Sequence, residues 1–208
     1  MKFPLTLDEP KVVIRLDLSD EQAARLRALQ RVFAQACNSI APLVASSRCW
    51  NRVGLHHLVY KDLREKFPQL GSQMACNAIY SVSKAARRVY QDPKSPWCAG
   101  RGSTAPLPVL RFLPGTPVFF DRHTLSLKAG VVSLFTLDGR LRFQINVSPQ
   151  LEARFAAEKL REIALMSDQT GYVLRFMVGD ADAQPDLEGP ELAVVVGPAG
   201  EPGQQEAT

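Results

Sequence analysis

The spacing of hydrophobic and polar positions changes near residue 95. Between about residues 20 and 91, apolar residues recur every three or four positions, which is the spacing of a helix with one buried face. Between about residues 107 and 179, they form short β-rich runs separated by turns, which is typical of antiparallel strands. The pattern therefore predicts a helical part followed by a β part, and KVVIRLDL (11–18) predicts one strand ahead of both.

The helical part is expected to contain three helices, over about residues 20–45, 55–67 and 73–91. The first begins with a capping box, in which Ser19 is the N-cap and Gln22 follows three residues later. Gly54 precedes the second helix and Pro68 closes it, while Ser72 is expected to cap the third. The apolar face of the second helix is expected to comprise Leu55, Leu58, Val59, Leu63 and Phe67.

The β part contains two hairpin signals. The dipeptide Asp138-Gly139 lies between two apolar runs, and SDQTG separates residues 162–166 from residues 172–179. Between the hairpins, Ser148-Pro149 predicts the start of a helix over about residues 149–161. Because an isolated strand must join a sheet, we expect strand 11–18 to complete the later β block.

The expected fold is α+β, a small antiparallel β-barrel with an inserted helical domain. The sequence predicts the first barrel strand in residues 1–18, the helical insert in 19–94, the barrel in 95–179 and an acidic tail in 180–208. The tail holds seven acidic residues and no Lys or Arg, so we expect it to be largely disordered apart from ELAVVV (191–196).

Charge is divided unevenly along the chain. The net charge is +4, yet residues 48–111 alone carry 11 basic and three acidic residues. A local excess of this size indicates either a polyanion-binding surface or a solvated basic surface. If the first holds, the acidic tail could shield the basic surface until RNA displaces it.

Basic residues occur on all three helices, in the following loop and on the strands, which phosphate neutralisation would explain together. Gln73 and Asn77 could address base edges with their amides, and Trp50, Tyr60, Tyr80 and Trp97 could stack on unpaired bases. The candidate nucleic-acid-binding residues are Arg48, Arg52, Lys61, Arg64, Lys66, Gln73, Asn77, Lys84, Arg87, Arg88, Arg111 and Lys128, and Arg140 and Arg142 add cations on a later strand.

No catalytic, metal or cofactor site is expected. The four cysteines contain no CxxC pair, and the adjacent His56 and His57 point in different directions on a helix, so they cannot chelate one ion together. The sequence contains no apolar run of membrane-spanning length, so no membrane association and a cytoplasmic location are expected.

The phrases ACNSI, LHHLVYKDLREKFP, SQMACNAI, FDRHTLSLKAGVVSLFTLDGRLRF and EIALMSDQTGYVLRFMV occur in an order and spacing that resemble the N-terminal region of TnpB (OrfB) proteins. These are transposon-encoded RNA-guided nucleases related to type V CRISPR effectors. The resemblance covers about residues 11–197. It implies a wedge-like, OB-related barrel with an inserted recognition domain, which together hold a guide RNA and recognise a short DNA motif near Gln73 and Asn77.

The resemblance also implies a difference from the family. Val195 occupies the position of the first metal-binding aspartate of the RuvC-like nuclease, so we expect binding without cleavage and no enzymatic activity. The implied partners are a guide or transposon-end RNA, target DNA, and a RuvC-bearing chain or a second copy of this one. The alternatives are a remnant or split subunit of an RNA-guided endonuclease, and a protein-interaction module that has lost its RNA.

Overall fold

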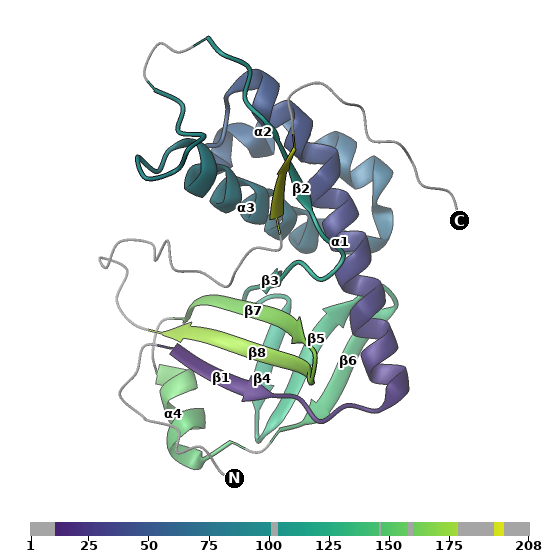
Figure 1. Ribbon diagram of the computed structural model, residues 1–208. Coiled ribbons are helices and arrows are strands. Elements are labelled where there is room, and N and C mark those ends of the chain that lie inside the picture. The colour runs from purple at the N-terminus through teal and green to yellow at the C-terminus, as the bar shows by residue number, and fades with distance from the viewer. Residues whose placement is uncertain (1–10, 101–103, 146, 158–159, 179–193, 198–208) are drawn as a thin grey trace.

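The computed structural model describes residues 11–100, 104–145, 147–157, 160–178 and 194–197. The molecule has a helical part and a β part, joined by a long helix that contacts both (Figure 1). Helices α1 (Asp20–Ser47), α2 (Arg52–Lys66) and α3 (Gly71–Tyr90) form the first part. The α+β class predicted from the hydrophobic pattern is confirmed.

Local sequence signals explain how two of these helices begin. Ser19 accepts a hydrogen bond from the Gln22 backbone and the Gln22 side chain accepts one from the Ser19 backbone, so the predicted capping box is confirmed. Helix α2 begins earlier than predicted, because Asn51 caps it by accepting from the N–H groups of Val53 and Gly54.

Two predictions about the helices are wrong. Ser72 does not cap α3, because the short 3₁₀ helix η1 (Pro68–Leu70) leads directly into α3 and places Ser72 inside its first turn. Leu58 does not belong to the buried face of α2, since its side chain is 52% exposed while Leu55, Val59 and Leu63 are buried.

The β part contains two sheets that share one hydrophobic core. Strands β1 (Lys11–Arg15), β8 (Gly171–Val178), β7 (Leu160–Asp168) and β3 (Val118–Phe120) form a four-stranded antiparallel sheet in that order. Behind it in Figure 1 lies a three-stranded antiparallel sheet of β4 (Leu125–Lys128), β5 (Val131–Thr136) and β6 (Gly139–Gln144). Leu174 and Phe176 of the first sheet and Val132 and Leu134 of the second are fully buried in the common core.

The predicted pairing of the first strand is confirmed, because Ile14 pairs with Leu174 and Arg15 with Val173 across β1 and β8. The closed barrel is not observed among the described strands. Consecutive strands β3 and β4 hydrogen-bond to different sheets, and the outer strands of the two sheets do not pair with each other in the described residues.

The helix predicted over 149–161 is shorter in the structure. Helix α4 spans Pro149–Ala157, and Leu160 already pairs with Val178 in the β7–β8 hairpin. Strand formation competes successfully at this end because β8 provides backbone partners along all of β7. Phe155 of α4 packs edge-on against Phe176, with ring centres 4.3 Å apart, which attaches the helix to the sheet.

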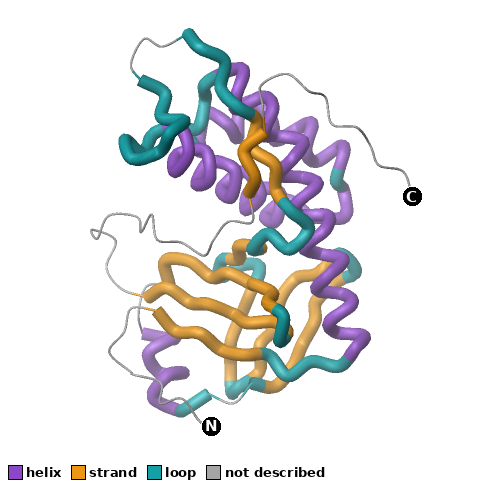
Figure 2. Tube along the Cα trace, in the orientation of Figure 1, coloured by secondary structure: helices purple, strands orange, loops and turns teal. Residues whose placement is uncertain are grey.

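A two-stranded ribbon lies against the helices rather than in the main sheets (Figure 2). It pairs β2 (Val109–Phe112) with β9 (Val194–Gly197), so part of the predicted strand ELAVVV is confirmed. The rest of the predicted tail, at 180–193 and 198–208, lies outside the described residues. The Asn38 amide of α1 donates to the Phe112 carbonyl at 2.9 Å and accepts from its N–H at 2.7 Å, which fixes β2 to the helix.

Candidate nucleic-acid interface

Helix α3 carries a polar stripe along one face. Its members recur every three or four residues, the spacing that brings side chains into one line on a helix, and they are Gln73, Cys76, Tyr80, Lys84 and Arg87. Each is at least partly exposed, while the opposite face of the helix is buried in the core. A ligand can therefore reach this stripe, together with the exposed Ser72 and Arg88 at the two ends of α3.

Tyr80 lies at the centre of this stripe and gathers cations around it. The Arg52 guanidinium lies 5.2 Å from the ring centre and the Lys84 ammonium 6.0 Å from it, which is cation–π geometry. Burial, followed by the nearby Glu162 carboxylate, raises the pKa of Tyr80 well above its ordinary value, while Arg52 and Arg87 oppose the shift. Tyr80 is therefore a neutral hydroxyl at physiological pH.

Cys76 lies one turn earlier and shares the influence of Arg52 with Tyr80. Burial raises the pKa of its thiol, Arg52 and Arg64 oppose that shift, and Asp121 adds to it. The structure thus brings Arg52 and Arg64 of α2 together with Lys84 and Arg87 of α3 along the seam between the two helices.

One of these cations is occupied by an internal partner. The Glu162 carboxylate of β7 accepts from Lys84 at 2.5 Å, from the Tyr80 hydroxyl at 2.8 Å and from Arg175 of β8 at 2.9 Å. Glu162 and Arg175 are almost completely buried. Lys84 therefore joins the helical part to the sheet, and its charge is neutralised in this state.

The two amides predicted to address bases differ in their accessibility. Gln73 donates to Asp121 and lines a cleft of about 360 Å³ together with His123 and Glu162. Asn77 is 5% exposed and its amide contacts the Met74 sulfur. Gln73 thus lines a cleft and is bonded to Asp121, whereas Asn77 is part of the core and we leave it out of the interface.

The remaining helical cations form no salt bridge with a carboxylate in the part of the chain that the structure describes. Lys61 and Lys66 on α2 and Arg87 and Arg88 on α3 are exposed. Among the residues that the structure describes, Lys84 is the one cation of segment 48–111 within salt-bridge distance of a carboxylate. Arg48 and Arg64 donate to main-chain carbonyls, of Ala105 and Pro68 respectively, and these bonds leave their charges uncompensated.

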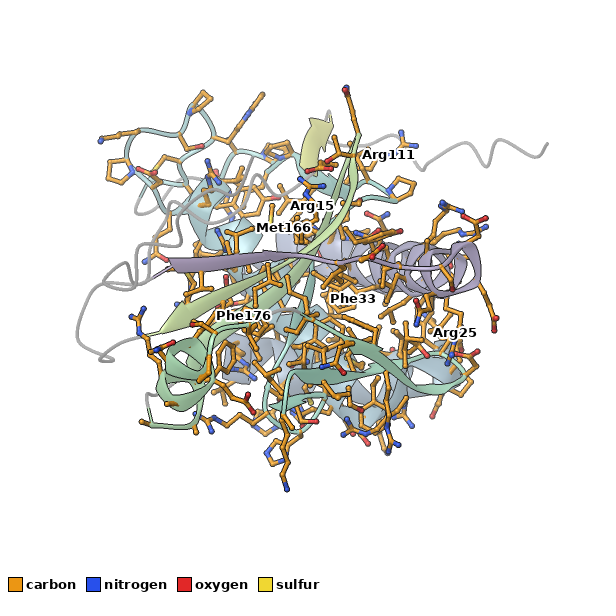
Figure 3. All side chains as sticks on the ribbon, turned by 90° about the horizontal axis from the view of Figure 1, so that it is seen from below. Arg15, Arg25, Phe33, Arg111, Met166 and Phe176 are labelled. Carbon is orange, nitrogen blue, oxygen red and sulfur yellow. The ribbon has the colours of Figure 1, made fainter. Side chains whose placement is uncertain are left out.

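Two predicted residues lie apart from the helical group. Arg111 is exposed on β2, and Figure 3 shows it on the same side of the molecule as Arg15. Lys128 is exposed at the end of β4 in the three-stranded sheet. The twelve predicted residues therefore do not form one patch. Lys66 lies with Asp62 in a groove between α2 and α1. Six others lie exposed or partly exposed on α2 and α3, and we call them together the α2–α3 surface: Arg52, Lys61, Arg64, Gln73, Arg87 and Arg88.

The aromatic residues predicted to stack on bases are mostly engaged within the protein. Trp50 packs against Tyr90 at 5.7 Å, and Tyr60 stacks on His56 at 4.5 Å. Trp97, at 47% exposed, is the large aromatic of this group that faces solvent. His57 is exposed and His56 is half-buried, in line with one histidine toward the interior and one toward solvent.

The cysteine and carboxylate side chains of the described residues do not gather at one site. The four cysteines are free, and burial strongly raises the pKa of the Cys37 thiol. No group of three or more His, Cys, Asp or Glu side chains is arranged to hold a metal ion in the part of the chain that the structure describes. In the same part, none of the helices has the length and apolar character needed to cross a membrane.

Three important residues were missed from the sequence. Glu162, Arg175 and Asn38 each act through partners more than ten positions away along the chain. Arg175 did offer a signal, because it interrupts the apolar strand YVLRFMV, where an arginine is buried only if it is paired. The other two have no comparable local pattern.

Comparison with known proteins returned no match, neither among protein-family models nor among curated proteins. The fold and the surface therefore define the class on their own: an α+β protein with a basic two-helix surface beside a pair of antiparallel sheets.

Proposed function

We propose that this chain is an RNA-binding protein that uses the α2–α3 surface to hold the sugar-phosphate backbone. The observation that supports this most strongly is the exposed arginine and lysine set of that surface, which outnumbers the α2 carboxylates Asp62 and Glu65 and forms no ion pair within the described residues. Assembling like charges costs electrostatic free energy, and binding a polyanion removes that cost while the protein cations release counterions condensed on the phosphates.

We further propose that the sheets and the inserted helices correspond to the OB-like wedge and recognition domains of TnpB-like proteins, and that the bound RNA acts as a guide for DNA recognition. Two features support this assignment. The chain leaves the β part after β1, forms the three helices and then returns to form the later strands. Gln73 lines a cleft that contains residues of α3 and β7. In such systems the protein holds the guide by its backbone, while base pairing supplies sequence specificity.

We assign binding rather than cleavage to this chain. Two-metal phosphodiester cleavage requires carboxylates that hold the ions. Val195, at the position of the first such aspartate in the resemblance, lies in β9, where its backbone pairs with Arg111. Incubation of the protein with RNA and DNA in Mg²⁺ should leave both intact, and cleavage that persists through purification would contradict this assignment.

The RNA-binding proposal is tested by the double substitution Arg87→Ala/Arg88→Ala. Both side chains are exposed, so the melting temperature should hardly change, while RNA affinity at low salt should fall. The slope of log affinity against log salt should decrease by roughly 1 to 2 units, as expected for two lost phosphate contacts. Fluorescence anisotropy with labelled RNA measures both quantities, and sequencing of RNA that copurifies with the protein identifies the natural ligand.

The matched control is Arg27→Ala/Arg31→Ala, which removes two exposed arginines from α1 and changes the net charge equally. It should retain most of the affinity. If both pairs weaken binding to the same extent, the interaction is a diffuse charge effect and the α2–α3 surface is not a site. If the unmodified protein ignores RNA in dilute buffer, the proposed function is wrong.

A further inference from the structure

The outer face of the three-stranded sheet has the composition of a surface that binds unpaired bases. Along β5 burial alternates, so Val132, Leu134 and Thr136 point to the core while Phe135 is 38% exposed. The same alternation exposes Arg140, Arg142 and Gln144 on β6 and Ser126 and Lys128 on β4. We call this face the sheet platform, and its members are Ser126, Lys128, Val131, Ser133, Phe135, Arg140, Arg142 and Gln144.

The strand register arranges these residues in rows across the sheet. Phe135 lies opposite Arg140, Ser133 lies opposite Arg142, and Val131 lies between Gln144 and Lys128. Directly opposite side chains in an antiparallel pair are close enough to interact. The platform therefore combines one aromatic ring with flanking cations within three adjacent strands.

Phe135 and Arg140 form a preassembled stack. The Arg140 guanidinium carbon lies 4.2 Å from the centre of the Phe135 ring. The guanidinium is held in place by the carbonyls of His123, at 3.0 Å, and Ser133, at 3.3 Å. Unpaired bases stack on aromatic rings and on arginine guanidinium planes, and both are exposed here.

The charges on this face favour an anionic ligand. Lys128, Arg140 and Arg142 are its three cations, and none of its eight members is acidic. Among carboxylates near this face, Asp138 pairs with Arg25 at 2.8 Å, while Glu152 accepts from the backbone of Ala129, beside Lys128. Phosphate groups would therefore complement this surface.

The platform is also connected to the α2–α3 surface. His123, whose carbonyl holds Arg140, lines the cleft that contains Gln73 and Glu162. Asp121 also lines this cleft, so the cleft adjoins both surfaces but carries two carboxylates of its own.

We propose that the sheet platform binds unpaired nucleotides of single-stranded RNA, with a base on the Phe135–Arg140 stack and phosphates on Lys128 and Arg142. This site rests on the RNA-binding function proposed above, and it adds a preference for unpaired segments that the helical surface alone does not provide. A cationic helical surface contacts any phosphate backbone, whereas stacking requires a base that is free of its partner.

The test compares binding of the full chain to a labelled uridine-rich single strand and to a labelled RNA duplex of the same length. Phe135→Ala should weaken binding of the single strand about fivefold or more, as expected from the loss of one stacked base, and should leave the duplex affinity within about twofold. Phe135→Trp, which keeps an aromatic ring at this position, should retain the single-strand affinity. The control Leu113→Ala removes an apolar side chain of matched exposure, 37%, outside the platform and should change neither affinity.

Ultraviolet cross-linking of the unmodified protein to the single strand gives a second readout that does not depend on a variant. The RNA adduct should map by mass spectrometry to the peptide that contains residues 131–144. An adduct confined to other peptides would overturn the proposal even if Phe135→Ala folds poorly.

The possible results separate the two proposals. If the unmodified protein binds RNA but Phe135→Ala binds the single strand equally well, the platform proposal is wrong and the RNA-binding function stands. Equal losses for the single strand and the duplex would exclude stacking on an unpaired base. If the unmodified protein binds neither the single strand nor the duplex, both proposals are wrong. That outcome would favour a role of Phe135 in binding a protein partner.

Discussion

At the scale of residues, Glu162 contributes more to the structure than any of the cations that were predicted from the sequence. Its two carboxylate oxygens join α3 to β7 and β8 through Tyr80, Lys84 and Arg175. A buried arginine is tolerated only when a counter-charge and hydrogen bonds replace its hydration. Glu162 supplies that counter-charge at the contact between the helical part and the sheet.

Glu162→Gln should therefore destabilise the protein strongly. The substitution leaves the Arg175 guanidinium buried without an opposite charge, and loss of one member of a buried ion pair costs about 3 kcal/mol or more of unfolding free energy. Urea denaturation followed by circular dichroism measures the change. The control is Asp168→Asn, which breaks the exposed pair with Arg15 at 3.4 Å and should have little effect. Equal effects of the two substitutions would argue against a special role for Glu162.

The sequence could not predict this network because its members are distant along the chain. Glu162 lies 82 residues from Tyr80 and 78 from Lys84, and no local pattern connects them. Lys84 therefore looked like one more exposed cation. Phe135 was missed for a different reason: in VVSLFT, alternation shows that two faces exist without showing which one meets the core.

At the scale of elements, a capping side chain made one helix start predictable, although the cap that Asn51 provides for α2 was missed. Ser19 and Gln22 set the start of α1 through their mutual hydrogen bonds. The start of α3 was not predictable in this way, because it follows the turn η1 and has no capping side chain. The end of α4 was missed because β8 competes for the same residues, and that competition exists only in the assembled sheet.

The attachment of the β2–β9 ribbon to α1 depends on one amide. Asn38→Ala should destabilise the protein by about 2 kcal/mol, because it leaves the N–H and C=O of Phe112 without their partner in a partly buried position. Ser39→Ala is the control on the next residue, since its hydroxyl bonds only to the Ala36 carbonyl within the same helix. Hydrogen exchange should show loss of protection in β2 for Asn38→Ala and not for Ser39→Ala. Unchanged protection in both variants would show that Asn38 does not hold β2 against α1.

At the scale of the whole molecule, the chain separates charge of opposite sign. Segment 48–111 is strongly basic, whereas residues 180–208 carry seven acidic and no basic side chains. The two segments are covalently linked through β8 and come together again where β9 pairs with β2. Under the RNA-binding function proposed above, we expect the acidic segment to compete with RNA for these cations at high effective concentration.

Neutralising part of the acidic segment tests this competition without removing β9. The combined substitution Asp180→Asn, Asp182→Asn, Asp186→Asn and Glu188→Gln should tighten RNA binding several-fold at low ionic strength. The gain should disappear at high salt, because screening weakens the competing attraction between exposed charges. An affinity that does not change at low salt would show that the acidic segment leaves the basic surface accessible.

The pairing of β1 with β8 has a consequence for biosynthesis. Helices α1 to α3 contain mostly contacts between neighbours in the chain, so they can associate while the ribosome is still translating the remainder. The first strand, by contrast, must wait with its backbone unsatisfied until residues 173–177 have emerged from the exit tunnel. The nascent polypeptide thus carries an unpaired β segment through most of its synthesis, and this is the interval in which it is most exposed to aggregation.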